Sequence, residues 1–387
     1  MDYSALLSRC AQDLRPSGIR KFFDLAATME GVISLGVGEP DFKTPYAIRR
    51  AGIESLEKGR TWYTANAGLL ELRRQIAAYL ARRFSLSYGE QDILVTVGGS
   101  EAIDLCIRAC IDPGDQVLVP EPSFVCYDPI TRLAGGVPVP IVTRPEDGFR
   151  LTPEALEAAI TPRTKVLVLP YPNNPTGAIM KREHLEAIAE VLLRRQILVL
   201  SDEIYAELTF EGKHVSIASL PGMAERTVVV NGFSKAYAMT GWRLGYAAGP
   251  REVIQVMTKL HQFAIMCAPT VSQHAAIEAM KSCDEEIERM AVQFGMRRGL
   301  MVNHLNRMGL TCADPLGAFY VFPSIRSTGL TSDQFCEQLL KEQKVAVVPG
   351  NAFGQSGEGH VRISYSYSVE HLIEALRRIE SFVEGLK

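Results

Sequence analysis

Several features that mark other protein classes are missing from this sequence of 387 residues. Its longest apolar stretches fall short of the roughly 20 residues that a transmembrane helix needs. Lys and Arg number 41 against 44 Asp and Glu, a net charge of −3, and no basic run suggests a nucleic-acid partner. Residues 1–4 lack a basic segment followed by an apolar one, so we expect no signal peptide. These absences argue against membrane and nucleic-acid functions.

The eight cysteines and seven histidines also lack the patterns of a metal site. No cysteine belongs to a C-x-x-C pair, and Cys106 and Cys110 lie in an apolar helical stretch that is typical of core packing. The histidines form no H-E-x-x-H motif. We therefore predict no metal. Scattered thiols without an export signal favour a cytoplasmic protein.

What is present is the composition of an ordinary globular protein. Hydrophobic residues make up 47% and charged residues 22% of the chain, which argues against disorder. The 31 glycines and 21 prolines exclude a collagen-like or low-complexity chain. The length allows two or three domains, and a chain of this size buries a large core without disulfides.

Short β-branched segments alternate with amphipathic segments through the middle of the chain. Continuous apolar runs of this length are typical of strands buried on both faces of a parallel sheet. Between two of them, residues 182–195 place apolar side chains at helical spacing. We therefore predict an α/β fold, with a large domain whose mostly parallel sheet is flanked by helices. The predicted strands are residues 93–97, 116–119, 165–169, 197–200, 227–230 and 244–246.

The last hundred residues predict a second, smaller α+β domain. Residues 284–308 and 371–386 have the pattern of long, charged helices, whereas residues 345–348 and 361–364 have that of strands. We expect both ends of the chain to build this domain. The predicted boundaries are residues 1–45 for an N-terminal arm and part of the small domain, 46–284 for the large domain, and 285–387 for the small domain.

Polar and glycine-rich segments follow four of the predicted strands. In open α/β sheets, ligands bind outside the carboxyl ends of the strands, so these four segments predict one binding crevice. In chain order they are Gly98-Gly99-Ser100, Asn173-Asn174-Pro175-Thr176-Gly177, Ser201-Asp202-Glu203-Ile204-Tyr205 and Asn231-Gly232-Phe233-Ser234-Lys235.

Each segment, taken alone, also has a purely structural explanation. Gly98-Gly99-Ser100 suits an anion at a helix start or a plain connection, and it is not the G-x-G-x-x-G fingerprint of nicotinamide and flavin sites. Residues 173–177 are typical of a turn. Asp202 suits a solvated strand end or the ring cation of a cofactor. Lys235 suits the surface or, when desolvated, a Schiff base.

Together and in this order, the segments N-N-P-T-G, S-D-E-I-Y and N-G-F-S-K-A-Y-A-M-T-G-W-R-L-G-Y resemble the pyridoxal-phosphate-dependent aminotransferases of fold type I, class I/II. Further matching segments lie at residues 34–42, 63–73 and 359–364, so the resemblance covers nearly the whole chain. It is strongest to members that act on aromatic amino acids, aspartate or N-acetyl-diaminopimelate. It implies a homodimer that moves an amino group from an L-amino acid to a 2-oxo acid, with pyridoxal 5′-phosphate as cofactor.

The resemblance also implies which residues bind the cofactor ring. Lys235 is expected to hold the cofactor as a Schiff base and to move the substrate's proton. Asp202 is expected to pair with the ring nitrogen, which keeps it protonated. Asn174 and Tyr205 are expected to bind the phenolic oxygen of the ring, and Phe124 is expected to stack on its face.

A second group is expected to hold the cofactor's phosphate. Gly99, Ser100 and Glu101 would offer backbone N–H groups at a helix start, with the Glu101 carboxylate turned away or capping its helix. Arg243 would clamp the phosphate with two hydrogen bonds, and Ser234 is the candidate for an added hydroxyl.

The resemblance assigns the remaining residues to the partner subunit and to the substrate. Tyr63 is expected to reach the phosphate bound by the other subunit, so that each active site is shared within the dimer. Arg362 is expected to bind the substrate's α-carboxylate, with help from Asn174 and the backbone of Gly38.

Two questions stay open at this point. A dicarboxylate substrate needs a second cation, for which Arg20 and Lys21 are candidates, as well as being ordinary solvated residues. The same fold and Lys235 also suit a carbon–sulfur β-lyase, which would release pyruvate without an oxo-acid acceptor. A non-catalytic regulator would carry an added DNA-binding domain, for which we expect no room before residue 31.

Overall fold

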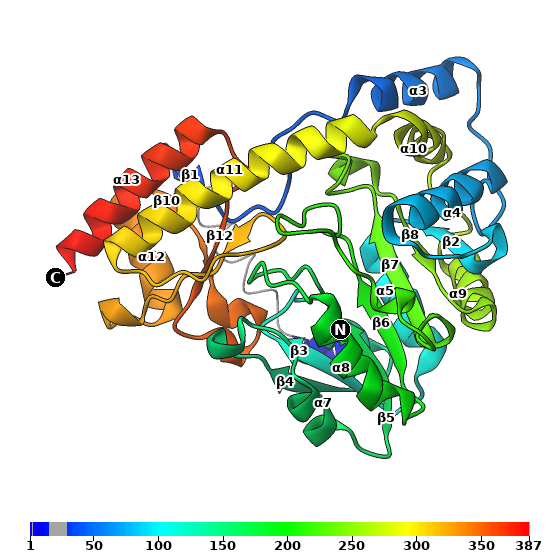
Figure 1. Ribbon diagram of the computed structural model, residues 1–387, viewed down its shortest axis with the longest axis horizontal. Coiled ribbons are helices and arrows are strands. Elements are labelled where there is room, and N and C mark those ends of the chain that lie inside the picture. The colour runs from blue at the N-terminus through cyan, green and yellow to red at the C-terminus, as the bar shows by residue number, and fades with distance from the viewer. Residues whose placement is uncertain (2, 15–28, 387) are drawn as a thin grey trace.

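Figure 1 shows the computed structural model of the protein, which describes residue 1, residues 3–14 and residues 29–386. One sheet has seven strands: β2 (Ile93–Thr96), β3 (Gln116–Glu121), β4 (Val137–Val142), β5 (Thr164–Leu169), β6 (Leu198–Asp202), β7 (Thr227–Gly232) and β8 (Gly245–Ala248). Their spatial order is β2-β8-β7-β6-β5-β3-β4. Neighbouring strands from β4 to β7 run parallel, and β8 runs antiparallel to both of its neighbours. The predicted mostly parallel α/β sheet is confirmed.

Helices cover both faces of this sheet (Figure 1), which explains why its strands are apolar on both sides. Along β7, Val228 and Val230 pack with the helices on one face, whereas Val229 packs with those on the other. The first face is covered by α5 (Gly99–Cys110), α6 (Tyr127–Leu133) and α9 (Arg251–Ala264). The second face is covered by α4 (Leu70–Phe84), α8 (Arg182–Leu193) and α10 (Thr270–Ser282), with α7 (Pro153–Ala159) beside α8 and α3 (Tyr46–Glu57) beside α10.

Strand β4 was not predicted from the sequence. Its residues, Val-Pro-Val-Pro-Ile-Val, include two prolines, and most of its side chains are partly or fully exposed. Proline has no N–H to donate and is tolerated at the edge of a sheet. Strand β4 is such an edge strand, paired on one side with β3 alone.

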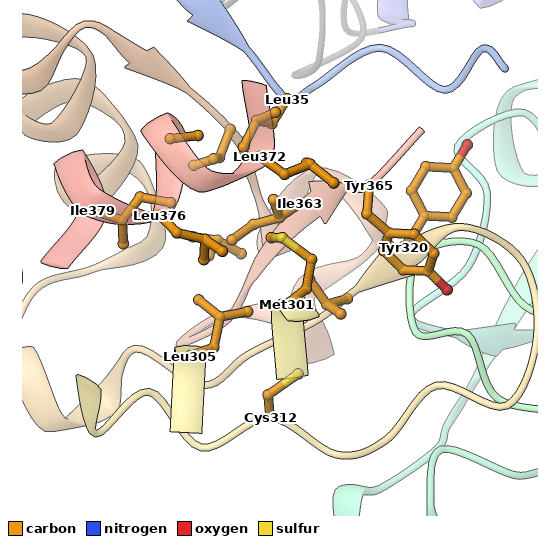
Figure 2. Packing of buried hydrophobic residues seen from close by; sticks show 14 of the residues in the cluster. Leu35, Met301, Leu305, Cys312, Tyr320, Ile363, Tyr365, Leu372, Leu376 and Ile379 are labelled. Carbon is orange, nitrogen blue, oxygen red and sulfur yellow. The ribbon is translucent and has the colours of Figure 1, made fainter. Parts of the chain in front are cut away.

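The C-terminal part of the chain forms two small sheets and three helices. The strands β11 (Val348–Pro349), β12 (Val361–Ser364) and β9 (Tyr320–Val321) form an antiparallel sheet in that order. Next to it lie α11 (Asp284–Met308), α12 (Ser332–Gln343) and α13 (Val369–Gly385). The short N-terminal helix α1 (Arg9–Asp13) contacts α6 on the large sheet instead. Figure 2 shows part of the apolar cluster between them, in which Met301, Ile363 and Leu376 are labelled.

Both ends of the chain meet in this region. Strand β1 (Ile33–Ser34) pairs in parallel with β10 (Val345–Ala346), and Leu35 lies in the same apolar cluster as Ile363 and Leu372. The single strand predicted for residues 345–348 is wrong, because β10 and β11 belong to different sheets. The domain boundaries after residues 45 and 284 stay a prediction.

None of the helices in the described ranges combines the length and the apolar character that crossing a bilayer requires.

Two neighbouring positions on α13 test the packing of this cluster. Leu372 is fully buried, whereas Ile373 is 53% exposed. Leu372→Ala should lower the free energy of unfolding by about 2–5 kcal/mol, because it leaves a cavity. Ile373→Ala, the matched control, should change it by less than about 0.5 kcal/mol. Denaturant unfolding of both variants measures the difference, and equal losses would contradict this packing.

Candidate active site

A cavity of about 790 Å³ lies at the carboxyl ends of the parallel strands. The structure brings most of the residues singled out in the sequence into its wall. These are Gly38, Gly99, Ser100, Phe124, Asn174, Asp202, Tyr205, Ser234, Lys235, Arg243 and Arg362. Glu101 and Tyr63 do not line it. The cavity is thus built from the large sheet, from the antiparallel sheet of β9, β11 and β12, and from the segment after β1.

Lys235 follows β7 by three residues and points its amine into the cavity. Its Nζ donates a hydrogen bond to the carbonyl oxygen of Gly38 at 2.6 Å. Burial lowers the pKa of the amine from 10.5 to about 8, while the negative charge of Glu39 opposes the shift. Such an amine loses its proton near neutral pH, which makes it a nucleophile and a base.

Asp202 is the last residue of β6, and its buried side chain lines the cavity. Tyr127 donates its hydroxyl hydrogen to Oδ2 at 2.6 Å, and the N–H of Ile204 donates to Oδ1 at 3.2 Å. Burial raises the pKa of Asp202, and the hydrogen bond from Tyr127 opposes that shift. No cationic side chain among the described residues pairs with this carboxylate, so a cation in the cavity would find a buried partner here.

Arg362 lies on β12 and is held from several sides. Its Nη1 donates to Oδ1 of Asn174 at 2.9 Å, and its Nη2 donates to the carbonyl oxygen of Gly36. The guanidinium carbon lies 4.5 Å from the ring centre of Tyr320 and 4.8 Å from that of Phe353. Burial lowers its pKa. Within the described residues its buried Nε has no hydrogen-bond partner, and the Arg362 side chain lines the cavity, where a guanidinium group suits a carboxylate.

The start of α5 forms an anion cradle opposite Arg243. Gly98 has φ +81°, and a Cβ there would lie 2.7 Å from Nη2 of Arg243. The backbone of Gly245 lies equally close to this turn, since a Cβ at Gly245 would lie 2.6 Å from the carbonyl carbon of Gly98. Only glycine fits both positions. The backbone N–H groups at the helix start and the guanidinium group thus face a common space, which suits a phosphate.

Glu101 in the first turn of α5 turns its carboxylate away from this cradle. Oε2 accepts a hydrogen bond from the N–H of Val97 at 2.5 Å, and Oε1 lies 2.7 Å from Nδ1 of His261. His261 is fully buried. Only the backbone of Glu101 is therefore available to an anion, which matches the expected orientation of its side chain.

Tyr63 lies on the surface of the single chain, 77% exposed and outside the cavity. Within one chain it therefore contributes nothing to the site. The candidates Arg20 and Lys21 lie outside the described residues.

Two tyrosines of the site were missed in the sequence analysis. Tyr127, the first residue of α6 and three residues after Phe124, donates a hydrogen bond to Asp202. Tyr320, at the start of β9, lines the cavity and places its hydroxyl oxygen 2.8 Å from that of Tyr205. Tyr127 follows β3, whose end carries none of the four polar segments that predicted the crevice, and Tyr320 belongs to the small antiparallel sheet. The G-A-F-Y run at residues 317–320 was a signal that could have drawn attention to the second.

The donor set suits one kind of ligand. A buried carboxylate suits a cationic ring, the cradle suits a phosphate, and an amine of lowered pKa suits an aldehyde carbon. Within the described residues, no group of His, Cys, Asp and Glu side chains could hold a metal ion.

Comparisons with known proteins agree with this chemistry. The family described as aminotransferase class I and II matches residues 30–379. The putative aminotransferase YugH of Bacillus subtilis (strain 168) is 54% identical, over 98% of this chain and 99% of its own. Aromatic-amino-acid aminotransferase 2 of Thermococcus litoralis is 44% identical over 98% and 99%. The structure of aspartate aminotransferase from Thermus thermophilus with maleate has a TM-score of 0.93 and 40% identity, and the match covers 97% of this chain and 99% of that one.

The lowered pKa of Lys235 gives a pH-dependent prediction. In protein freed of bound small molecules, an amine-specific reagent should label Lys235 half-maximally near pH 8, because only the neutral amine reacts. A lysine in a short peptide, whose pKa is about 10.4, is the reference. Peptide mass spectrometry after labelling at a series of pH values measures both. A midpoint for Lys235 as high as that of the peptide would show that its amine is not desolvated.

Proposed function

Since this chain belongs to the aminotransferase class I and II family, and is an aminotransferase that uses pyridoxal phosphate, we propose which of its residues do the work and which substrate it takes. The proposal assigns the cofactor to Lys235, Asp202 and the cradle, and the substrate's α-carboxylate to Arg362. It names an L-amino acid with an aromatic or other large apolar side chain as the amino donor and a 2-oxo acid as the acceptor.

The buried carboxylate of Asp202 supports the placement of the cofactor ring. When bound, pyridoxal phosphate draws electrons from the α-carbon of the substrate, so that this carbon can lose a proton. Asp202 would hold the ring nitrogen in its protonated form, and Tyr127 and the N–H of Ile204 keep the carboxylate in place. Asn174 and Tyr205 would bind the phenolic oxygen, and Phe124 would pack on the ring.

Two further features support the placement of the phosphate. Gly99 and Ser100 open α5 behind the left-handed turn at Gly98, and Arg243 faces them across the cradle. Ser234 lines the same cavity and would add a hydroxyl donor. The carboxylate of Glu101, which is bonded to Val97 and His261, would stay away from the phosphate charge.

Lys235 would carry the proton transfers. With a pKa of about 8, its amine is available both to bind the cofactor and, once released, to take a proton from the α-carbon and return it at the end of the half-reaction. The carbonyl oxygen of Gly38 holds the amine by a hydrogen bond of 2.6 Å. Because Gly36 of the same segment accepts from Arg362, the base and the carboxylate-binding group share one backbone support.

The substrate proposal rests on the cations in the cavity wall. Within the described residues they are Lys235, Arg243 and Arg362, and each already has a role in the proposal above. A second carboxylate on the substrate would find no further cation among them, and burying it unpaired is costly. The remaining wall includes Val37 and Ile103 and is suited to an apolar side chain. The name of the Thermococcus relative agrees with this choice, whereas the Thermus relative is named for aspartate.

A donor screen tests the substrate proposal. With pyruvate or 2-oxoglutarate as acceptor, kcat/KM for phenylalanine or tyrosine should exceed that for aspartate at least tenfold, because the distal carboxylate is left without a partner. Lys235→Ala is the control for background transfer. A preference for aspartate would refute the substrate assignment while leaving the aminotransferase activity intact. Release of pyruvate from cystathionine without acceptor would identify β-lyase activity.

We further propose that the enzyme is a homodimer whose active sites include Tyr63 of the partner subunit. Trp62, Tyr63 and Phe263 are 68%, 77% and 82% exposed, which is unusual for such large apolar side chains. Their segments lie together, since Thr270 donates to the carbonyl oxygen of Trp62 and Asn66 to that of Met266. A second copy of the chain would cover this surface.

Mixing two variants of low activity tests whether the active site is shared between subunits. Lys235→Ala and Tyr63→Ala proteins should each be weak alone. In a mixed dimer, one site collects both defects, and the other, with Lys235 and the Tyr63 of the partner subunit intact, has neither. Activity after joint refolding should therefore exceed the sum of the two parents. If Tyr63 acts within its own chain, every site keeps one defect and no such rise occurs.

The proposed place of work is the cytoplasm. All eight cysteines are free thiols, spread over surface and core, and a reducing compartment keeps thiols in this state.

A further inference from the structure

Tyr320, which contacts Tyr205, is a residue of the cavity wall to which the proposal above assigns no role. Tyr205 follows β6 of the large sheet, whereas Tyr320 begins β9 of the small antiparallel sheet. Both side chains are almost fully buried, both line the cavity, and their hydroxyl oxygens lie 2.8 Å apart. Among the described residues, neither hydroxyl has another hydrogen-bond partner.

Counting hydrogens leaves two arrangements for this pair. Each phenol has one hydrogen to donate and two lone pairs to accept. One hydrogen lies between the two oxygens, and the other is left over for the cavity. If Tyr320 donates, Tyr205 keeps its hydrogen for a ligand. If Tyr205 donates, its oxygen can only accept, and it has nothing to offer a negatively charged ligand oxygen.

Arg362 favours Tyr320 as the donor. Its guanidinium carbon lies 4.5 Å from the ring centre of Tyr320, and a positive charge over the ring makes the phenol more acidic and a better donor. Burial raises the pKa of both phenols. The charge of Arg362 is the main opposing influence on the pKa of Tyr320, and the hydrogen bond between the two phenols lowers the pKa of Tyr320 and raises that of Tyr205.

Gly38 keeps space for the Tyr320 hydroxyl. A Cβ at Gly38 would lie 2.1 Å from this oxygen, so glycine is required next to it. The carbonyl oxygen of Gly38 is also the acceptor for Lys235. The hydroxyl of Tyr320 therefore sits between Tyr205 and the segment that holds the base, with no room to swing toward that segment.

We propose that Tyr320 is a positioning residue, which donates its hydroxyl hydrogen to Tyr205 and so leaves the hydrogen of Tyr205 directed at the phenolic oxygen of the cofactor. The inference rests on the proposed role of Tyr205. A phenol that accepts one hydrogen bond becomes a stronger donor in a second one. Tyr320, on the small antiparallel sheet, would in this way strengthen the hydrogen bond from Tyr205 to the cofactor.

The pH dependence of the cofactor's absorption tests this inference on the holoenzyme. The absorption of the bound cofactor follows the proton on the nitrogen that joins it to Lys235. A donor to the neighbouring phenolic oxygen stabilises negative charge there, and the oxygen then holds this shared proton less tightly. If the donor to the phenolic oxygen is weakened, the pH at which the absorption of the cofactor changes should therefore rise.

Three variants separate the contributions. Tyr320→Phe removes one hydroxyl and keeps the ring beneath Arg362. Tyr205→Phe removes the proposed donor itself. Tyr365→Phe is the matched control, because Tyr365 is equally buried, lies beside Tyr320 in the cluster of Figure 2, and loses one hydrogen bond, to the carbonyl oxygen of Ala318.

Tyr320→Phe should move the transition upward by roughly 0.2 to 0.6 pH unit, a fraction of the roughly one to two units expected for Tyr205→Phe. The double variant should show no shift beyond that of Tyr205→Phe, since Tyr320 acts through Tyr205. Tyr365→Phe should leave the transition unchanged. KM for the amino donor should stay within about twofold in Tyr320→Phe, because the ring under Arg362 remains.

The sign of the shift decides between the two arrangements. A downward shift in Tyr320→Phe would mean that Tyr205 was the donor of the pair, and an unchanged transition would mean that the pair does not act on the cofactor. Either result overturns the inference, as does an equal shift in Tyr365→Phe. If Tyr205→Phe itself leaves the transition unchanged, the proposed role of Tyr205 fails first.

Discussion

Keeping charged groups out of water is the constraint that shapes this cavity. Lys235, Asp202 and Arg362 all line it, and the burial of each group shifts its pKa in the direction that favours the neutral form. Each is stabilised by hydrogen bonds from or to neutral groups: a carbonyl oxygen for the lysine, a phenol for the aspartate, and an amide and a carbonyl for the arginine. None is paired with an opposite charge among the described residues. The site is therefore held ready for charges that a cofactor and a substrate bring.

This arrangement needs parts of the chain that are far apart in sequence. The large sheet supplies Lys235 and Asp202, the small antiparallel sheet supplies Arg362 and Tyr320, and the segment after β1 supplies the carbonyl groups between them. The pairing of β1 with β10 fixes that segment against the C-terminal part of the chain. The relative position of Lys235 and Arg362 thus depends on contacts outside the large sheet.

Much of this could be predicted because the relevant signals are local. Apolar runs revealed the buried strands, and the segments that follow them pointed to the cavity, since a parallel sheet brings its carboxyl ends together. Strand β4 escaped because its prolines hide an edge strand. The split of residues 345–348 into two strands escaped because pairing partners, which no local pattern encodes, decide where a strand ends.

The two tyrosines of the site that were not predicted escaped for the same reason. Tyr127 and Tyr320 act by touching Asp202 and Tyr205, and those contacts exist only once the helix α6 and the small sheet have packed. The expected direction of the Glu101 side chain, by contrast, needed only the phosphate that the resemblance implies and the repulsion between like charges. Properties set by one residue's own chemistry were accessible from the sequence, whereas those set by a neighbour distant in the chain were not.

The meeting of the two chain ends has a consequence for biosynthesis. Residues 33–38 leave the ribosome early, yet their partners on β10 and β12 are made more than three hundred residues later. Domains generally fold as units during synthesis, with the N-terminal ones first. Here the large sheet can form while the chain is still growing, but one wall of the cavity has to wait for the last strand. We therefore expect the growing chain to pass through a stage in which Lys235 is in place and Arg362 is not.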